Sequence, residues 1–310
     1  MKPALSIILF TTIGGAAQGI AVVAAAATLA GRAPQGAMPL LLWTATAMLV
    51  VALIASFFHL GHPLRAWRAV LMWRTSWMSR EVIALPAFIA LIAAWAAMST
   101  FVRLDSDVSN VLAVLTIAGA LMLWYCTAMI YACIRFIQEW AHPLTIVNYT
   151  MLGIASGLVA AGALAVVADE REFADAIGVW ALAATALAWG TRGLSLRRNA
   201  TLKLKSSIQS ATGIRSARVE QKSMGFTGGS FNTREFFHGA SARVFGMAKV
   251  GFQVLVFAVP IVLLAWVAVS GQPFVWMLAL VSQATGLLVE RWFFFAQARH
   301  PQNLYYQVVS

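Results

Sequence analysis

The sequence predicts an all-α, polytopic integral membrane protein with eight transmembrane helices. Hydrophobic residues make up 61% of the 310 residues and charged residues only 11%, a composition typical of membrane proteins and not of soluble domains. The apolar residues gather in runs of roughly 20 residues or more with almost no internal charge, and such a run is long enough to cross a bilayer as a helix. The Lys and Arg residues lie mainly between these runs, where their distribution indicates the orientation of the chain.

Eight apolar runs follow one another along the chain. We expect spans at 4–30, 39–60, 81–101, 108–134, 145–168, 173–191, 248–270 and 273–296. The first run follows Lys2 as a signal peptide would, but it is far longer than a signal-peptide core, so we interpret it as the first span. The segment 192–247 is too long and too polar for an ordinary connection, and we expect a long loop there within a single membrane domain, 1–310.

The basic residues predict the orientation of these spans. With eight spans, the two termini and the even-numbered connections share one side, which receives 19 of the 22 Lys and Arg residues, and the other side has only Arg32, Arg103 and Arg171. Cytoplasmic loops are enriched in Lys and Arg, so both termini and the long loop are predicted to be cytoplasmic. Without the long loop, the first side still has 8 Lys and Arg residues and the other side has 3. The net charge of +11 therefore reflects membrane orientation, and we expect a lipid bilayer and no nucleic acid as partner.

Glycine pairs inside the spans predict close helix packing. Gly15 and Gly19, and again Gly153 and Gly157, are spaced four residues apart, the pattern with which membrane helices approach one another. Gln18 lies beside the first pair, and we expect it to form a hydrogen bond across a helix interface.

The Cys and His residues limit the redox chemistry of the chain. Its two cysteines cannot supply the four thiolates of an iron–sulfur cluster, so no such cluster is expected here. All five histidines lie at or near the predicted cytoplasmic face, which excludes a two-haem relay across the bilayer; they are His59, His62, His142, His238 and His300. A single haem b near that face, where His59 and His142 could approach each other, is left open but disfavoured. The expected cofactor is a diffusible quinone.

The stretch 58–81, FHLGHPLRAWRAVLMWRTSWMSRE, predicts one wall of a quinone site. It holds four arginines, two histidines, three tryptophans and a glutamate between two apolar spans, and ionisable residues at such a position are costly unless they have a partner or a task. His59 and Glu81 are of the types that relay protons to a quinone. Arg65 and Arg80 could hold the carboxylate or donate to a quinone oxygen. As an alternative, Arg80 and Glu81 could form an ordinary interfacial ion pair.

Glu290 and Arg291, at the end of the last span, are a second candidate wall of this site. The alternative is a salt-bridged helix end with an aromatic belt, since aromatic residues follow closely in both 292–295 and 305–306.

The long loop combines basic and aromatic residues, which disordered linkers lack. Its glycines at 225–229 lack the Lys-Ser/Thr ending and the strand of a phosphate-binding loop. Arginine and aromatic side chains anchor protein interfaces, so we predict a docking surface that includes Arg215, Phe226, Phe231, Arg234, Phe236 and His238.

These motifs resemble those of the membrane anchor subunits of the dimethyl sulfoxide reductase type, most closely the anchors of cytoplasm-facing sulfite dehydrogenases. The resemblance covers essentially the whole chain. It is carried by HLGHPLRA at 59–66, SRE at 79–81, QSATG at 209–213, SMGFTGGSFNTREFFHG at 223–239, ERWFFF at 290–295 and RHPQNLYY at 299–306.

The resemblance implies an electron-transfer role without catalysis on the sulfur compound. The anchor would hold a molybdopterin catalytic subunit and a four-cluster ferredoxin-like iron–sulfur subunit at the cytoplasmic side of a bacterial inner membrane and exchange electrons with quinone. The family's quinone-site histidine and glutamate fall on His59 and Glu81. Arg80 stands where the dimethyl sulfoxide reductase anchor has a neutral residue. That difference, with the long basic loop, favours sulfite as donor and ubiquinone as acceptor.

The sequence is also compatible with three alternatives. The chain could serve a dimethyl sulfoxide reductase-like enzyme that oxidises menaquinol, or it could be an anchor that does not itself react with quinone. A transporter is a more distant alternative, because the sequence shows no paired broken helices and no ionisable residues at mid-membrane.

Overall fold

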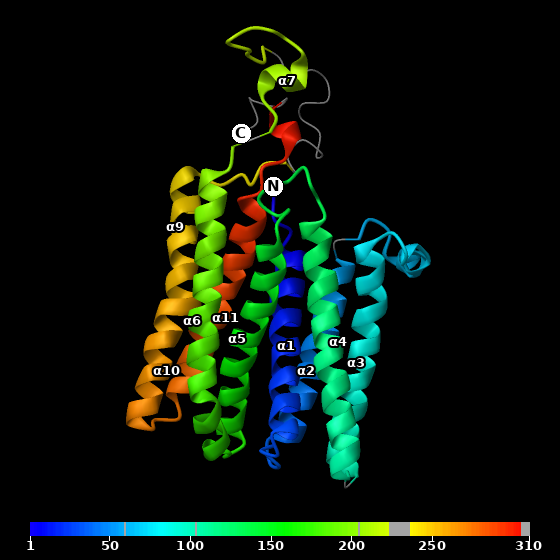
Figure 1. Ribbon diagram of the computed structural model, residues 1–310, viewed down its shortest axis with the longest axis vertical. Helices are drawn as coiled ribbons and strands as arrows, with labels where there is room; N and C mark the ends of the chain where they lie inside the picture. Colours follow the sequence, from blue (N-terminus) through cyan, green and yellow to red (C-terminus); the bar gives the residue numbers. More distant parts are fainter. Residues whose placement is uncertain (59, 103, 204, 223–235, 305–310) are drawn as a thin grey trace.

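Each long apolar run of the sequence forms a helix, and the helices lie side by side in one elongated bundle (Figure 1). The computed structural model describes residues 1–58, 60–102, 104–203, 205–222 and 236–304. Its long helices are α1 (Leu5–Leu29), α2 (Met38–Phe57), α3 (Trp77–Phe101), α4 (Ser106–Ala132), α5 (Pro143–Val167), α6 (Arg171–Thr201), α9 (Ala242–Gln253), α10 (Val259–Ser270) and α11 (Val275–Ala296). The described residues form no strand, and the all-α prediction is confirmed.

Within the described residues, seven helices are long and apolar enough to cross a membrane. They are α1 to α6 and one continuous helix, Ala242–Ser270, in which a π-helical turn, Val254–Ala258, joins α9 to α10. The last long helix, α11, has 22 residues and is less apolar, and it packs within the bundle against α5, α9 and α10. Residue 1 and the described end of the chain lie at the same end of the bundle (Figure 1), which we call the N-terminal end.

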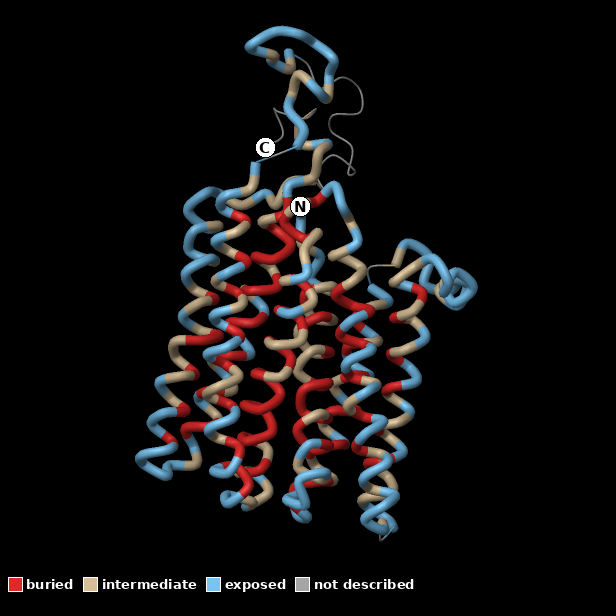
Figure 2. The backbone as a smooth tube through the Cα atoms, in the orientation of Figure 1, coloured by how far each residue is buried: buried red, intermediate tan, exposed pale blue. Residues whose placement is uncertain are grey.

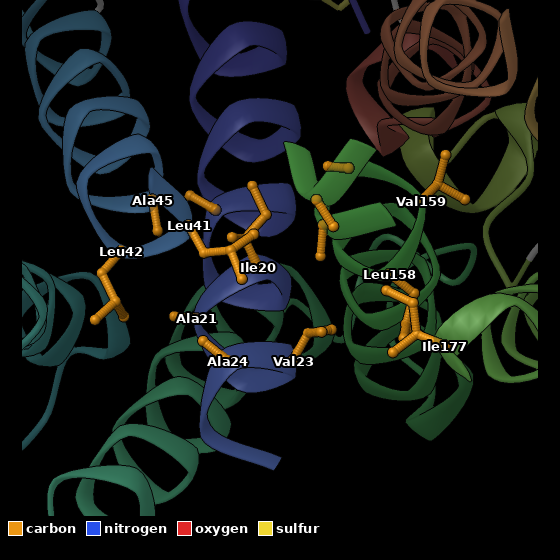
Figure 3. Packing of buried hydrophobic residues seen from close by; sticks show 14 of the residues in the cluster. Ile20, Ala21, Val23, Ala24, Leu41, Leu42, Ala45, Leu158, Val159 and Ile177 are labelled. Atoms are coloured by element: carbon orange, nitrogen blue, oxygen red, sulfur yellow. The ribbon is translucent and has the colours of Figure 1, made fainter. Parts of the chain in front are cut away.

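Small residues allow the central helices to pack closely. Ile20, Ala21 and Ala24 of α1 lie between residues of α2 and α5 (Figure 3). A Cβ atom at Gly19 would lie 2.0 Å from the carbonyl oxygen of Gly153, so only glycine fits there. Membrane helices associate mainly through such packing. The predicted glycine contact is therefore confirmed for the α1–α5 interface.

Gly15 and Gln18 depart from the predicted packing. A Cβ atom at Gly15 would meet nothing within 4 Å, so the interface is open at this position. The amide nitrogen of Gln18 donates to the carbonyl oxygen of Gly14 on its own helix, at 3.0 Å. The expected hydrogen bond across the interface is not formed by this donor, because the backbone oxygen one turn earlier is nearer.

Buried residues line the inner faces of the helices, and exposed residues face outward (Figure 2). Many of the outward residues are large and apolar, including Val179, Trp180, Leu187 and Val262. A soluble monomer rarely exposes so much contiguous apolar surface, whereas lipid accepts it.

Two predicted boundaries of the long loop are wrong. Helix α6 continues to Thr201, ten residues past the expected end of the sixth span at 191, and α9 begins at Ala242 instead of 248. The loop is therefore 202–241 and contains the short helix α7 (Ile208–Thr212). The extra turns of α6 are polar, but they turn Arg192, Ser195 and Asn199 into the bundle, where these side chains find partners.

The connection between α2 and α3 stands beside the bundle instead of against it (Figure 1). Most of it is a 3₁₀ segment, Pro63–Met72, whose residues are all exposed or only partly buried. Leu64 is 94% exposed and Trp67 64% exposed, so this segment does not pack as part of the protein core.

Candidate functional site

Glu81 is a buried carboxylate near the N-terminal end of the bundle. Helix α3 begins after Ser76, whose hydroxyl accepts the backbone N–H of Ser79 at 3.3 Å and so caps the helix. Glu81 lies in the first turns that follow and is 8% exposed. The hydroxyl of Thr127 on α4 donates a hydrogen bond to its Oε1 atom. An acidic group buried inside a membrane bundle is costly, which makes Glu81 a functional candidate.

Arg80 does not form the alternative ion pair with Glu81 in the described structure. Its Nε atom donates to the carbonyl oxygen of Trp73 at 2.9 Å, and its second amino group donates to that of Arg74 at 2.9 Å. The guanidinium also lies 4.0 Å from the centre of the Trp77 ring, a favourable cation–π distance. Arg80 therefore fastens the α2–α3 connection to the start of α3.

The other predicted residues of this wall are not brought to Glu81. Arg65 is exposed in the 3₁₀ segment beside the bundle. His59 lies outside the described residues, and its position relative to Glu81 stays a prediction.

Glu290 of α11 is the centre of a buried cluster of three charges. Its Oε1 atom lies 2.7 Å from Nε of Arg192, and its Oε2 atom lies 2.6 Å from Nε of Arg291. The three side chains are between 0% and 4% exposed. Two guanidinium groups share one carboxylate, so the cluster carries a net positive charge.

The sequence predicts Arg192 at the start of the long loop, whereas in the structure it is buried within α6. The signal for its burial is the spacing of Arg192, Ser195 and Asn199, which are three and four residues apart and therefore share one helical face. That face points inward, with Ser195 accepting a hydrogen bond from Asn148 at 2.7 Å. Glu290 and Arg291, predicted as a second wall of the site with a salt-bridged helix end as the alternative, do form a salt bridge, and both are buried inside the protein.

A pair of tyrosines lies between Glu81 and this charged cluster. Tyr131 of α4 and Tyr149 of α5 stack with ring centres 5.9 Å apart, and Arg291 lies 4.3 Å from the centre of the Tyr149 ring. Both tyrosines are close enough to Glu81 to interact with it electrostatically. The helices that carry the two predicted walls do not pack closely together: α3 packs against α2 and α4, whereas α11 packs against α1, α5, α9 and α10. That both walls border one quinone stays a prediction.

A cavity opens at the N-terminal end, between the ends of α6 and α11 and the start of α9. Its volume is about 860 Å³, and Asn199, His238, Lys249 and Gln297 are among its lining residues. We call it the end cavity. Burial lowers the pKa of His238, which favours the neutral imidazole at pH 7.

Of the predicted docking residues, Phe236 and His238 line the end cavity. Phe236 stacks on His300 with ring centres 4.5 Å apart, and His238 stacks on Phe245 at 5.3 Å. Arg215 is exposed in the loop. Phe226, Phe231 and Arg234 lie outside the described residues.

No group of three or more His, Cys, Asp or Glu side chains could hold a metal ion within the described part of the chain. Cys126 is buried and Cys133 exposed, both as free thiols. The sequence expectation about haem depends on His59 and is not tested by the structure.

The sequence is similar to one known protein family and to two individual relatives. Residues 1–297 match the family described as the DMSO reductase anchor subunit (DmsC). The C subunit of the sulfite dehydrogenase of Allochromatium vinosum is 44% identical over an alignment of 331 positions that covers both proteins completely. The C component of the anaerobic dimethyl sulfoxide reductase of Haemophilus influenzae is 27% identical over 127 positions, which cover 41% of this protein and 45% of the relative.

Proposed function

This chain belongs to the DMSO reductase anchor subunit family, and from that premise we propose that it passes electrons from an iron–sulfur subunit to a quinone. Membership implies a membrane anchor in a complex with catalytic and iron–sulfur subunits. The sulfur compound would react on the molybdopterin subunit and not on this chain. The observation that carries the quinone proposal is the buried Glu81 with its hydrogen bond from Thr127.

Glu81 suits the chemistry that quinone reduction requires. A quinone takes up two electrons and two protons, so the protein must supply protons beside an apolar slot for the ring. A buried carboxylic acid close to the membrane surface can act as the proton donor. Arg80 and the tryptophans Trp73 and Trp77 form a polar and aromatic rim beside it. The proposed site also includes the sequence-predicted His59.

The position of the two ends of the chain supports an eight-span topology. An odd number of crossings would place residue 1 and the described C-terminal residues at opposite ends, yet they lie at the same end (Figure 1). We therefore take α11 as the eighth span, with its charged residues Glu290 and Arg291 in ion pairs inside the bundle. The distribution of Lys and Arg supports a cytoplasmic N-terminal end, and we propose a bacterial inner membrane.

The proposed partners dock at this end. The end cavity and the loop 202–241 together present basic and aromatic groups, including Arg215, Phe236 and His238. A four-cluster ferredoxin-like subunit seated there would bring its terminal cluster to the same end of the bundle as Glu81. The proposed docking set also includes the sequence-predicted residues Phe226, Phe231 and Arg234.

Sulfite is the donor that we favour, with ubiquinone as acceptor. The full-length relative at 44% identity is named a sulfite dehydrogenase subunit, whereas the dimethyl sulfoxide reductase relative matches less than half of the chain. The second candidate, oxidation of menaquinol for a dimethyl sulfoxide reductase-like enzyme, would use the same site in the opposite direction.

The test uses the complex co-purified with its soluble subunits. Sulfite-driven reduction of a short-chain ubiquinone is compared with reduction of a water-soluble dye, for the wild type and Glu81→Gln. We expect the quinone rate to fall by about 100-fold or more, since positioned acids contribute roughly 10²–10⁴-fold, and the dye rate to persist. Glu172→Gln, an exposed glutamate in the first turn of α6, is the matched control.

The same assay separates the alternatives. An unchanged quinone rate in Glu81→Gln would refute the site. If dimethyl sulfoxide oxidises a quinol while sulfite drives no acceptor, the second candidate replaces the first.

A further inference from the structure

The connection between α2 and α3 contains a 3₁₀ helix of unusual length, Pro63–Met72. It has 10 residues, whereas 3₁₀ runs beyond roughly four residues are uncommon. Residues 64–75 read LRA, WRA, VLM and WRT, a pattern that repeats at every third residue. A 3₁₀ helix has about three residues per turn, so residues three apart lie above one another. The period of this sequence therefore matches the 3₁₀ helix and divides it into three faces.

One face is a large apolar stripe and a second face is basic. The apolar stripe consists of Leu64, Trp67 and Val70, which are 94%, 64% and 39% exposed. The second face begins with Arg65 and Arg68, which we call the basic pair, and the next triplet has leucine at this position. The helix is therefore amphipathic, with its apolar side uncovered by the rest of the chain.

The third face is the least exposed. Ala66 and Ala69 are partly buried, whereas the other residues of Pro63–Met72 are exposed. The helix contacts α3, and Figure 2 shows the connection mostly as exposed backbone. Packing against the bundle thus leaves the apolar stripe and the basic pair free for another partner.

The connection projects sideways from the bundle at the level where α2 ends and α3 begins. Both helices are long and apolar enough to cross a membrane; α2 ends at Phe57 and α3 begins at Trp77. Figure 1 shows the connection standing outward beside α3, whereas α7 in the loop 202–241 lies beyond the end of the bundle. A segment that projects sideways at this level meets the surface of the bilayer that holds α2 and α3.

The apolar stripe continues a lipid-facing surface on both adjoining helices. Ile54 and Phe57 in the last turns of α2 are 53% and 42% exposed, and Met78 in the first turn of α3 is 50% exposed. Such exposed apolar side chains at the end of a span face lipid, and Trp favours the boundary between acyl chains and headgroups. The proposed docking end for soluble subunits lies elsewhere, at α6 and α9, so a lipid surface fits this stripe better than a protein does.

The basic pair has the charge that binds phosphate. Residues 58–80 contain no acidic residue, and neither Arg65 nor Arg68 forms an ion pair with a described residue. A guanidinium group binds phosphate oxygens through paired hydrogen bonds, and basic residues at a membrane surface attract anionic lipids. Arg68 lies 5.5 Å from the centre of the Trp67 ring, so the basic and apolar faces meet along one edge.

We propose that the helix Pro63–Met72 lies on the bilayer surface, with its apolar stripe at the boundary of the acyl chains and its basic pair on the phosphate groups of anionic phospholipids. This arrangement is that of amphipathic surface helices. Arg80 donates to the carbonyl oxygens of Trp73 and Arg74 and so ties the lipid-bound segment to the first turn of α3. The inference depends on the membrane-anchor assignment and not on the quinone site.

The test places a photocrosslinking residue on the apolar stripe, as Trp67→p-benzoylphenylalanine in the whole complex. The complex is reconstituted in vesicles of phosphatidylcholine with a minor share of phosphatidylglycerol, irradiated and analysed by mass spectrometry. We expect the chain to gain the mass of one phospholipid. Phosphatidylglycerol should be enriched in the adducts by about fivefold or more over its share in the vesicles, since one basic residue near an anionic surface contributes a factor of about five.

Controls use the same probe at other exposed positions. Leu64→p-benzoylphenylalanine on the same stripe should reproduce the result. Trp180→p-benzoylphenylalanine, on the outer face of α6, should give lipid adducts without enrichment, and Ile214→p-benzoylphenylalanine, in the loop 202–241, should give none; both residues are exposed.

The charge is tested in the chain that has the probe at position 67. Arg65→Gln combined with Arg68→Gln should lower the share of phosphatidylglycerol in the adducts to its share in the vesicles. Lys203→Gln combined with Lys205→Gln removes the same charge from exposed positions of the loop and should leave the enrichment unchanged.

Other outcomes overturn the proposal. An adduct between position 67 and a soluble subunit would make the stripe a protein interface. If neither lipid nor protein is attached while Trp180→p-benzoylphenylalanine captures lipid, the helix stands in water. Lipid adducts without enrichment, or an enrichment that survives loss of the basic pair, would refute the assignment of these arginines to anionic headgroups.

Discussion

At the scale of single residues, the cluster of Arg192, Glu290 and Arg291 is the least expected feature of the protein. Burying a charge costs several kcal/mol, on the order of 3–5 kcal/mol when one partner of a buried pair is removed. Here one carboxylate offsets two guanidinium groups, and rings of Phe252, Phe293, Tyr149 and Phe294 lie against the two cations. The aromatic faces partly replace the missing second anion.

The charge balance of this cluster predicts an order of stability. Glu290→Gln leaves two buried cations without an anion and should destabilise the complex by roughly 3–5 kcal/mol. Arg192→Met leaves the neutral pair of Arg291 and Glu290 and should cost less. The thermal unfolding midpoint of the detergent-solubilised complex measures both effects. An equal or larger loss in Arg192→Met would contradict this account, and Glu172→Gln at the exposed start of α6 is the control.

At the scale of helices, close contact between α1 and α5 depends on glycine. The Cβ atom of an alanine at Gly157 would lie 2.2 Å from the backbone of Gly19. Neither helix can yield by rotating a side chain, because the atoms in conflict are backbone atoms. The two helices would have to separate, and the packing on both sides of α1 would loosen.

Gly157→Ala should therefore destabilise the bundle by about 1–3 kcal/mol, the usual cost of overpacking, and lower the amount of assembled complex in the membrane. Gly246→Ala in α9 adds the same methyl group where nothing lies within 4 Å. It should be neutral or slightly stabilising, since alanine favours helix. If the two variants gave equal yields of assembled complex and equal thermal unfolding midpoints, the α1–α5 contact would tolerate separation of the two helices.

The sequence predicts the existence of these helices better than their ends and their polar contacts. Apolar runs are visible in composition, so α1 to α5 were expected close to where they occur. The end of α6 was not expected at Thr201, because Arg192 and Asn199 count as polar in any hydropathy average. Only the inward orientation of these two side chains explains why the helix continues. Likewise, the contact of Arg80 with Trp77 depends on the path of the connection, which the residue types do not define.

At the scale of the whole molecule, the order of helices around the bundle decides which candidate residues meet. Glu81 and Glu290 were expected to form two walls of one site, since both lie near the predicted cytoplasmic ends of their spans. Helices α1, α4 and α5 lie between α3 and α11, and two tyrosines occupy the space. Neighbour relations of this kind arise from tertiary packing and have no signal in a single sequence.

The topology predicts which exposed positions a membrane-impermeant maleimide can reach. In a chain with Cys126→Ala and Cys133→Ser, single cysteines would replace four exposed residues, namely Asp107, Lys205, Gln272 and Gln302. Asp107 and Gln272 lie at the end of the bundle opposite residue 1, and Lys205 and Gln302 lie at the N-terminal end. If that end is cytoplasmic, as the distribution of Lys and Arg predicts, Asp107→Cys and Gln272→Cys should react in spheroplasts, and Lys205→Cys and Gln302→Cys only in inverted vesicles. Reaction of Gln302→Cys on the same side as Gln272→Cys would mean that α11 does not cross the membrane, and reversal of all four would invert the orientation.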